Sequence, residues 1–383
     1  MNLSFIRKNK GIYHALLAAR SLSGRTWMRM QNRLGGIAPK RVFFSSFKGK
    51  AYSDSPRFIS EALHALRPDV EIVWQLEDPA DAPDYVRVVP PHSLKALTEL
   101  SRARCFVDNF NRPIYLLKFP GQLYVQTWHG DRGFKKMLYD MNDGLKYPDY
   151  AQMDLAVSGS DFGTKNYRSA FRYAGEVMQT GMPRNDALVH PDETRIADVR
   201  RRLNVGSARV LLYAPTFRDS TAGHAQKAGF DVGRALQALR TATGEEWLCL
   251  TRAHDQNRAI EAAPESDVRD VTAWPEMSEL LLAADLLITD YSSSAGDYAL
   301  LNRPTILYQP DLSQFVSDDR EMYFDLKTCP YLRAESEDAL MALLSDFPRL
   351  PLRGEDVLRF YGATETGRSA QDVAKWIADR IER

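Results

Sequence analysis

The stretch from Leu286 to Leu301, LLITDYSSSAGDYALL, decides the fold of this chain. Four apolar residues predict a short buried strand, and an acidic, serine-rich turn follows it. The serines before Ala295 are typical of the start of a helix, and this helix is expected to end near Leu301. A strand that leads through a polar turn into a helix is the repeating unit of an α/β fold with a parallel sheet.

The same order of strand and helix recurs along most of the sequence. Because helices alternate with the strands, we predict two tandem Rossmann-like, doubly wound domains that face a cleft, with polar strand ends converging there. The expected boundaries are a basic arm at 1–40, domains at 41–185 and 186–360, and a C-terminal helix at 361–383. The predicted strands lie at 42–44, 71–74, 85–89, 105–107, 123–127, 210–213, 247–250, 286–289 and 305–308.

Charge is distributed unevenly, although the 383 residues carry 50 basic and 50 acidic side chains and no net charge. Eleven Lys and Arg residues precede Asp54, the first acidic residue. Ile12, Leu16 and Ala19 recur at helical spacing in this arm, which predicts a basic amphipathic helix. Such a helix suits the anionic inner face of a membrane. Packing of its apolar side onto the body is the alternative, and nucleic-acid binding is disfavoured because no recognition motif accompanies the charge.

Several classes of protein are excluded by what the sequence lacks. Three widely spaced cysteines without a C-x-x-C pair argue against a disulfide scaffold or a cysteine zinc site and suggest a reducing cytoplasm. No apolar run approaches the roughly 18–20 residues of a membrane span, and no signal-peptide cleavage site is found. The glycine-rich fingerprints of NAD-binding and Walker-type proteins are also missing. We therefore predict a cytoplasmic protein that requires no metal or cofactor.

Two histidines at the ends of predicted strands are candidates for acid–base chemistry. His129 and His254 have an ordinary pKa near 6.5, which suits proton transfer at neutral pH, although a histidine in a loop is more often a plain surface residue. The Ser292–Ser294 run at a helix start could bind an anion or simply cap the helix. Together with Arg218 or Arg252, these residues indicate a site for an anionic substrate.

Six short motifs then follow one another in order. They are SFKGKAYSDSP at 46–56, QTWHG at 126–130, TGMPRND at 180–186, YAPTFRD at 213–219, RAH at 252–254, and ITDYSS at 288–293 with Asp297 in register. This set resembles the CDP-glycerol glycerophosphotransferase family, the teichoic acid primases and polymerases.

The resemblance implies a GT-B-like enzyme that binds its nucleotide mainly through the second domain. The implied reaction transfers a polyol phosphate from CDP-glycerol or CDP-ribitol to a hydroxyl of a lipid-linked acceptor and releases CMP, in the synthesis of teichoic acid or a related cell-wall polymer. The basic arm would hold the enzyme peripherally on the inner membrane face. Mg²⁺ is not indicated.

The resemblance also assigns residues to the predicted site. His129 is the expected base, and His254 and the arginines are expected to stabilise the charge of the transition state. Two departures from the family pattern occur near it: Asp131-Arg132-Gly133 replaces Thr-Pro-Leu, and Asp255 replaces a proline. The catalytic residues implied are His129 and His254, and those implied to bind the donor are Gly130, Asp131, Arg132, Gly133, Arg184, Pro215, Thr216, Arg252, Ala253, Ser292, Ser293 and Asp297.

Two other functions remain open from the residues alone. The same fold occurs in sugar transferases that use a nucleotide sugar. If this chain is one of them, UDP or GDP rather than CDP should stabilise it against thermal unfolding. A non-catalytic protein that binds a membrane surface through the basic arm is the alternative of another class.

Overall fold

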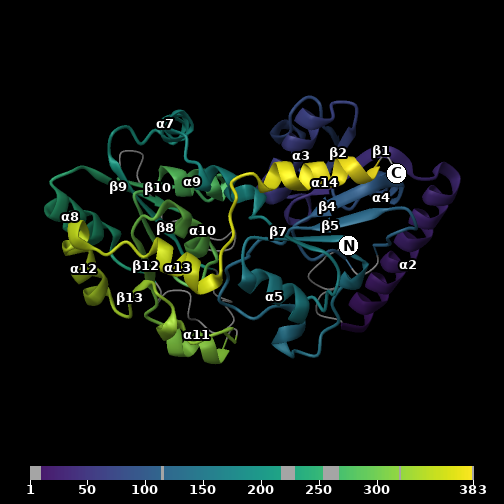
Figure 1. Ribbon diagram of the computed structural model, residues 1–383. Coiled ribbons are helices and arrows are strands. Elements are labelled where there is room, and N and C mark those ends of the chain that lie inside the picture. The colour runs from purple at the N-terminus through teal and green to yellow at the C-terminus, as the bar shows by residue number, and fades with distance from the viewer. Residues whose placement is uncertain (1–9, 114–115, 217–228, 253–266, 319–320, 382–383) are drawn as a thin grey trace.

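Two parallel sheets side by side form the body of the protein in the computed structural model (Figure 1). The structure describes residues 10–113, 116–216, 229–252, 267–318 and 321–381. The first sheet has seven strands and the second has six. Both carry helices, as the alternation of strands and helices predicts.

The first sheet has the strand order β3-β2-β1-β4-β5-β6-β7, and every pairing in it is parallel. The order reverses between β1 and β4, so the sheet has its topological switch point there. β3 is shorter than the predicted 85–89. The strands are β1 Ala38–Ser45, β2 Glu71–Gln75, β3 Arg87–Val89, β4 Ala103–Asp108, β5 Leu123–Gln126, β6 Leu155–Ser158 and β7 Val177–Gln179.

The second sheet repeats this winding, with the order β10-β9-β8-β11-β12-β13 and its switch point between β8 and β11. The strand predicted at 286–289 is β11, in the centre of this sheet, and all four of its residues are buried. The strands are β8 Arg209–Ala214, β9 Trp247–Thr251, β10 Val268–Asp270, β11 Leu286–Thr289, β12 Thr305–Tyr308 and β13 Leu332–Ala334.

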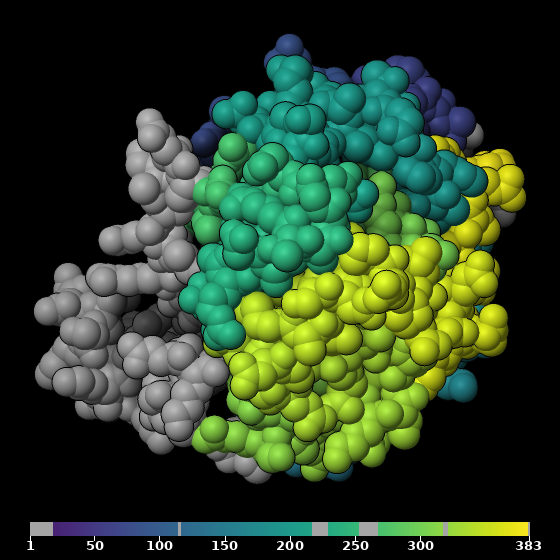
Figure 2. Space-filling model, turned by 90° about the vertical axis from the view of Figure 1, so that its left-hand side faces the viewer, coloured from purple at the N-terminus to yellow at the C-terminus, as the bar shows by residue number. Residues whose placement is uncertain are grey.

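Helices cover the second sheet and build the end of the molecule seen in Figure 2. α8 and α12 contact each other and bury Leu236, Leu239, Leu340 and Leu344 against the sheet. α9 begins two residues after the predicted Pro275. The helices of this half are α6 Asp186–Val189, α7 Glu193–Arg202, α8 Val232–Thr243, α9 Met277–Ala283, α10 Ser294–Tyr298, α11 Leu312–Asp318, α12 Glu337–Ser345 and α13 Gly354–Tyr361.

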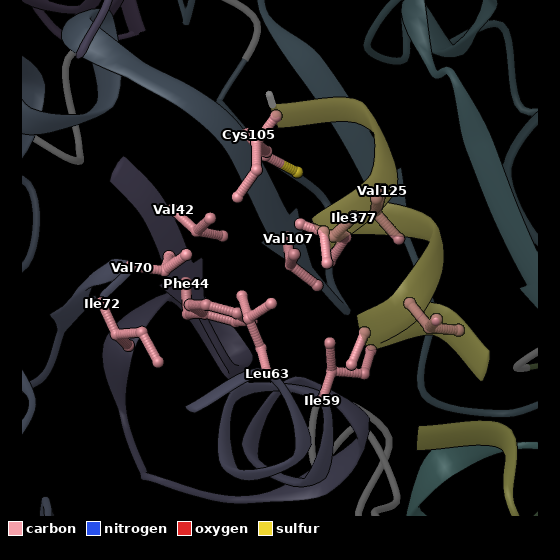
Figure 3. Packing of buried hydrophobic residues seen from close by; sticks show 14 of the residues in the cluster. Val42, Phe44, Ile59, Leu63, Val70, Ile72, Cys105, Val107, Val125 and Ile377 are labelled. Atoms are coloured by element: carbon pink, nitrogen blue, oxygen red, sulfur yellow. The ribbon is translucent and has the colours of Figure 1, made fainter. Parts of the chain in front are cut away.

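The last helix, α14 (Ser369–Ile381), returns to the first sheet and packs against α3 (Asp54–Leu66) (Figure 1). In the close view, Ile377 of α14 lies beside Val107 and Val125, opposite Ile59 and Leu63 of α3 (Figure 3). The first sheet therefore shares a hydrophobic core with the end of the chain. α4 Leu94–Arg102 and α5 Asp161–Ser169 are two further helices of this half.

The basic arm contains a long helix, α2 (Lys10–Gly35), on the outer side of the first sheet (Figure 1). α2 packs along α4: Met28 is buried, and Nε1 of Trp27 donates to Oγ1 of Thr98 at 3.0 Å. The face of α2 that carries Trp27 and Met28 therefore packs onto the body of the protein, which was the alternative to membrane binding. The basic arm was predicted to extend to residue 40. The helix ends at Gly35, and residues 38–40 already belong to β1. Across the described part of the chain, no helix is both long enough and apolar enough to span a bilayer.

Candidate active site

His129 lies in the loop after β5, and neighbouring groups hold its ring on several sides. Its Nδ1 is 2.7 Å from the backbone oxygen of Asn109, the ring of Phe110 stacks on it at 4.8 Å, and Phe47 contacts it edge-on at 5.6 Å. A carbonyl oxygen can only accept, so in the neutral ring Nδ1 carries the hydrogen and Nε2 keeps its lone pair. The ring is thus oriented as a proton acceptor.

The surroundings also favour the neutral form of His129. Burial lowers its pKa below the ordinary 6.5, and the positive charge of Arg184 acts in the same direction. The hydrogen bond to Asn109 and the negative charge of Asp54 oppose this shift without cancelling it. At neutral pH the imidazole is therefore unprotonated, as a general base must be.

The loop that carries His129 contacts the turn after β11 in the second sheet, residues 290–294, which we call the serine turn. A Cβ placed on Gly130 would lie 3.1 Å from Oγ of Ser293, and one on Gly133 would lie 3.9 Å from its Cβ. Glycine at 130 permits this close approach. The structure therefore brings the loop of His129 next to Ser293.

The serine turn is built from the ends of β8 and β11. Both carboxylate oxygens of Asp290 accept from the backbone N–H of Thr216, at 2.9 and 3.1 Å, and Thr289 donates to the carbonyl of Ala214. Ser292 accepts hydrogen bonds from Ser294, where the five-residue helix α10 begins. Thr216, Pro215, Ser292 and Ser293 are all partly exposed at this edge of the sheet.

Arg184 joins the site from the segment after β7. Its Nε donates to Oδ2 of Asp297 at 3.1 Å, and Nη2 lies 3.0 Å from the same oxygen. Nη1 lies 3.7 Å from Oδ1 of Asp54. Both Nη atoms are buried, yet neither makes an aligned hydrogen bond within the protein. Each of them therefore keeps hydrogen-bonding capacity that no protein group uses.

Asp131, Arg132 and Asp297 are engaged in the interior instead. The Arg132 side chain is fully buried and forms ion pairs with Asp297 at 3.0 Å and with Glu365 at 2.7 Å. Asp131 accepts from Ser158, Ser160 and the N–H of Gly159. Burial raises the pKa of Asp297, but Arg184 and Arg132 outweigh it and the net pKa is lowered.

These contacts differ from the predicted role. Asp131, Arg132 and Asp297 were expected to bind the donor, and their described partners are protein groups. Contact with the donor stays a prediction for all three. In the structure, Arg132 joins the His129 loop to Gly296 and Asp297 of α10, and Asp131 joins it to the end of β6. This holds the loop in place next to the serine turn.

Residues that sequence reasoning did not single out complete the site. Asn109 orients His129, and its side chain also accepts from the N–H of Phe47 at 2.9 Å. Glu365 accepts hydrogen bonds from Arg132 and Asn185. Oε2 of Glu276 accepts from the N–H of Asp54 at 2.9 Å, and this hydrogen bond links the two halves of the molecule. Asn109 directly follows β4, so its position at a strand end was the signal available for it.

The second predicted histidine lies outside the described residues, as do Ala253, Arg218 and Asp255. The face-to-face arrangement of His129 and His254 therefore stays a prediction. Arg252 is described: it follows β9, is half-buried, and its Nη1 lies 3.1 Å from the sulfur of Met277.

Several curated proteins are similar to this chain in sequence. Over 309 residues the chain is 32% identical to the teichoic acid poly(glycerol phosphate) polymerase of Staphylococcus epidermidis. The match covers 76% of this chain and 43% of that protein. This chain is 31% identical over 368 residues to the Bacillus subtilis polymerase of the same name, covering 89% and 49%. The chain thus spans about half the length of these two relatives.

Other relatives are nearer to this chain in length or differ in their polyol. The teichoic acid glycerol-phosphate transferase of Staphylococcus aureus is 32% identical over 330 residues, covering 79% of this chain and 82% of that protein. A poly(ribitol-phosphate) polymerase of Bacillus spizizenii is 30% identical over only 63% of this chain.

A solved structure agrees over the whole fold. The wall teichoic acid polymerase TagF has a TM-score of 0.82 and 27% identity, with 100% of this chain and 99% of that one covered. A histidine variant of TagF was also solved after a soak with CDPG. The family model for CDP-glycerol:poly(glycerophosphate) glycerophosphotransferases matches residues 26–378. By this match, and by its likeness to these relatives, the chain belongs to the CDP-glycerol:poly(glycerophosphate) glycerophosphotransferase family.

Proposed function

We propose that this chain transfers glycerol phosphate from CDP-glycerol to a hydroxyl of a lipid-linked acceptor and releases CMP, in the synthesis of teichoic acid or a related polymer. One observation carries the proposal: a histidine oriented as a base lies in a loop that touches the serine turn of the other sheet. Membership of the family supports CDP-glycerol as the donor. Glycerol is preferred to ribitol because the glycerol-phosphate transferase relative matches more of the chain.

The reaction follows from the groups at the site. Nε2 of His129 accepts the proton of the acceptor hydroxyl as its oxygen bonds to the phosphorus that carries glycerol. The bond from this phosphorus to the bridging oxygen breaks, and its electron pair leaves with CMP. Negative charge on the phosphoryl oxygens would be stabilised by the Nη atoms of Arg184, by Ser292 and Ser293, and by Arg252 and His254.

We also propose that these protein groups neutralise the diphosphate without a required metal ion. Arg184 supports this, because its two buried Nη atoms have hydrogen-bonding capacity left over. Turnover should therefore persist in excess EDTA. A complete loss that added Mg²⁺ restores would contradict this part of the proposal.

Release of CMP from CDP-glycerol, with a lipid-linked acceptor present, tests the function directly. Replacing His129→Ala should lower the rate about 10²–10⁴-fold, the usual worth of a positioned base. His190→Ala is the matched control, since His190 is an exposed histidine at the end of α6. Normal turnover in His129→Ala would remove His129 from its role.

The choice of donor is tested in the same assay. CDP-ribitol in place of CDP-glycerol should give much slower release of CMP. Protection against heat by CDP or CMP is expected, whereas protection by UDP or GDP alone would favour a nucleotide-sugar transferase.

We infer further that the outer face of α2 lies on an anionic inner membrane surface. Leu22, Met30 and Leu34 recur at multiples of four residues and are exposed by 68, 41 and 77%. Arg29 and Arg33 are exposed beside them. An apolar stripe flanked by cations on an amphipathic helix suits the interface of such a membrane.

Co-sedimentation with vesicles tests this surface. The protein should bind vesicles that contain phosphatidylglycerol, and added salt should weaken the binding. The double substitution Leu22→Asn and Leu34→Asn should reduce it, while Leu66→Asn, at an exposed leucine of α3, should not. Equal binding to neutral vesicles would contradict the inference.

A further inference from the structure

A pocket opens at the switch point of the first sheet, away from the serine turn where the donor is expected. It has a volume of about 40 Å³ and lies between the ends of β1 and β4, with Ser45 and Asp108 in its lining. Ligands of open α/β sheets bind outside the carboxyl ends of the strands at such points. The serine turn occupies the equivalent position in the second sheet, between β8 and β11.

Arg112 lies in the pocket lining near Asp108, on which its charge acts, and one of its buried nitrogens has no partner in the protein. Arg112 is only 9% exposed, and its guanidinium lies 4.7 Å from the ring centre of Phe106 and 4.8 Å from that of Tyr124. Its Nη2 is buried and has no hydrogen-bond partner in the protein. A buried donor of this kind is costly unless a ligand engages it, and a guanidinium matches phosphate oxygens well.

Lys48 adds a positive charge to the lining of the pocket. Lys48 lies over the ring of Phe110 at 4.8 Å, and His92 lines the same opening. Burial lowers the pKa of His92, and the charges of Arg20 and Lys48 add to this, against the opposing charge of Glu77. Arg20 of α2 therefore lies near enough to His92 for its charge to act on this side chain.

The loop that presents Lys48 is strained and firmly held. Phe47, Lys48 and Gly49 have φ values of 45, 64 and 97°, a left-handed conformation that costs non-glycine residues free energy. The backbone N–H of Phe47 is held by Asn109, and the carbonyl of Gly49 accepts from Glu77 at 2.8 Å. Such strain persists at sites where function needs a fixed geometry. The physical role of the motif at 46–56 is therefore to hold Lys48 in a fixed position at the pocket.

Phe110 joins the pocket to the reaction centre. Its ring lines the pocket and also stacks on His129, with 18° between the two ring planes. A molecule seated in the pocket would therefore extend past Phe110 toward the imidazole. The donor is expected on the opposite side of His129, at the serine turn.

We propose that this pocket binds the acceptor through a phosphodiester, with Arg112 and Lys48 as the anion-recognising residues, so that the terminal glycerol hydroxyl of a polyol-phosphate chain reaches His129. The inference rests on the proposed function and names the acceptor class for it. With a volume of about 40 Å³, the pocket is too small for a prenyl chain. Leu97, Leu100 and Phe43 provide apolar walls for the carbon atoms of a polyol unit.

Steady-state kinetics with a lipid-free trimer of glycerol phosphate as acceptor tests this inference. Lys48→Met should raise the acceptor KM at least about 10-fold and leave the KM of CDP-glycerol unchanged, since an ionised hydrogen-bond donor is lost from one substrate only. Arg112→Lys, which keeps the charge and loses the fork, should act in the same direction. Lys95→Met is the control, because Lys95 is an exposed lysine of α4 outside the pocket lining.

Calorimetric titration with glycerophosphoglycerol, in the presence of saturating CDP, measures the same pocket without turnover. Binding should weaken about 10-fold in Lys48→Met and Arg112→Lys, and free glycerol should not compete. Unchanged binding and acceptor KM in both variants would overturn the inference, as would equal competition by glycerol. If the wild type binds glycerophosphoglycerol but releases no CMP, the proposed function fails and the pocket assignment stands.

Discussion

At the scale of single residues, the protonation state of His129 should set the acidic limit of activity. Burial lowers its pKa below 6.5, and a protonated ring cannot accept the proton of the acceptor. Release of CMP should therefore fall as the pH drops through a midpoint below 6.5 and be level above it. The pH dependence of kcat/KM for the acceptor measures this midpoint, and a midpoint above 6.5 would contradict the assignment.

Asp54 provides a sharper version of this test. Its negative charge raises the pKa of His129, against the effect of burial. Asp54→Asn keeps the shape of the side chain and removes the charge, so the acidic midpoint should move to still lower pH. Asp84→Asn, at an exposed aspartate, should leave the midpoint where it is.

Individual site residues could be predicted only where they stand at strand ends within a motif. His129 and Ser293 were found in this way, and the structure brings their loops together. Arg132 was assigned to the donor, but it lies buried between Asp297 and Glu365. A charged side chain looks the same in a sequence whether it faces a ligand or an interior partner, and Glu365 is 233 residues away from Arg132.

At the scale of elements, the segment 180–186 connects the site to the last helix. The carboxylate of Asp186 accepts from the N–H groups of Ser369 and Ala370, at 2.9 and 2.8 Å, and so caps α14 from outside the helix. Asp186→Ala should lower the free energy of unfolding by about 1 kcal/mol, the usual worth of a cap. Chemical denaturation measures this, and an unchanged midpoint would show that the cap contributes nothing.

The pH dependence of stability gives the same element a second test. Burial raises the pKa of Asp186 to about 6, from an ordinary 3.8, although the two backbone hydrogen bonds oppose the shift. Between these values the folded protein binds more protons at this site than the unfolded chain does. Relative to Asp186→Asn, the wild type should therefore lose stability as the pH rises from about 4 to 6, and the two curves should run parallel above that.

Strands and helices were easier to predict than the surfaces they pack on. Buried apolar runs located β8, β9, β11 and β12 because a central parallel strand is covered on both faces. For α2, periodicity could indicate only an amphipathic helix. Trp27 and Met28 face the body while Leu22 and Leu34 are exposed, and a sequence pattern cannot tell which apolar side meets protein.

At the scale of the whole molecule, two sheets with the same winding place their switch points on either side of His129. The serine turn lies at one switch point and the Arg112 pocket at the other. Phe110, which lines this pocket, stacks on His129, and Gly130, the residue after His129, lies against Ser293 of the serine turn. Donor and acceptor would then approach the base from different sheets. The relative position of the two sheets is therefore part of the catalytic apparatus, and contacts such as that between Asp54 and Glu276 maintain it.

The helix α14 adds a connection of another kind, because the end of the chain completes the core of the first sheet. Trp376 is 6% exposed, belongs to that core, and donates from Nε1 to Glu176 at 3.0 Å. Trp376→Ala should lower the free energy of unfolding by about 3–5 kcal/mol, as for other large aromatic residues removed from a core. Because α14 packs on α3, hydrogen exchange should become faster in α3 and β1 while β8 and β9 keep their protection. Equal loss of protection in both sheets would instead show that α14 stabilises the molecule as one cooperative unit.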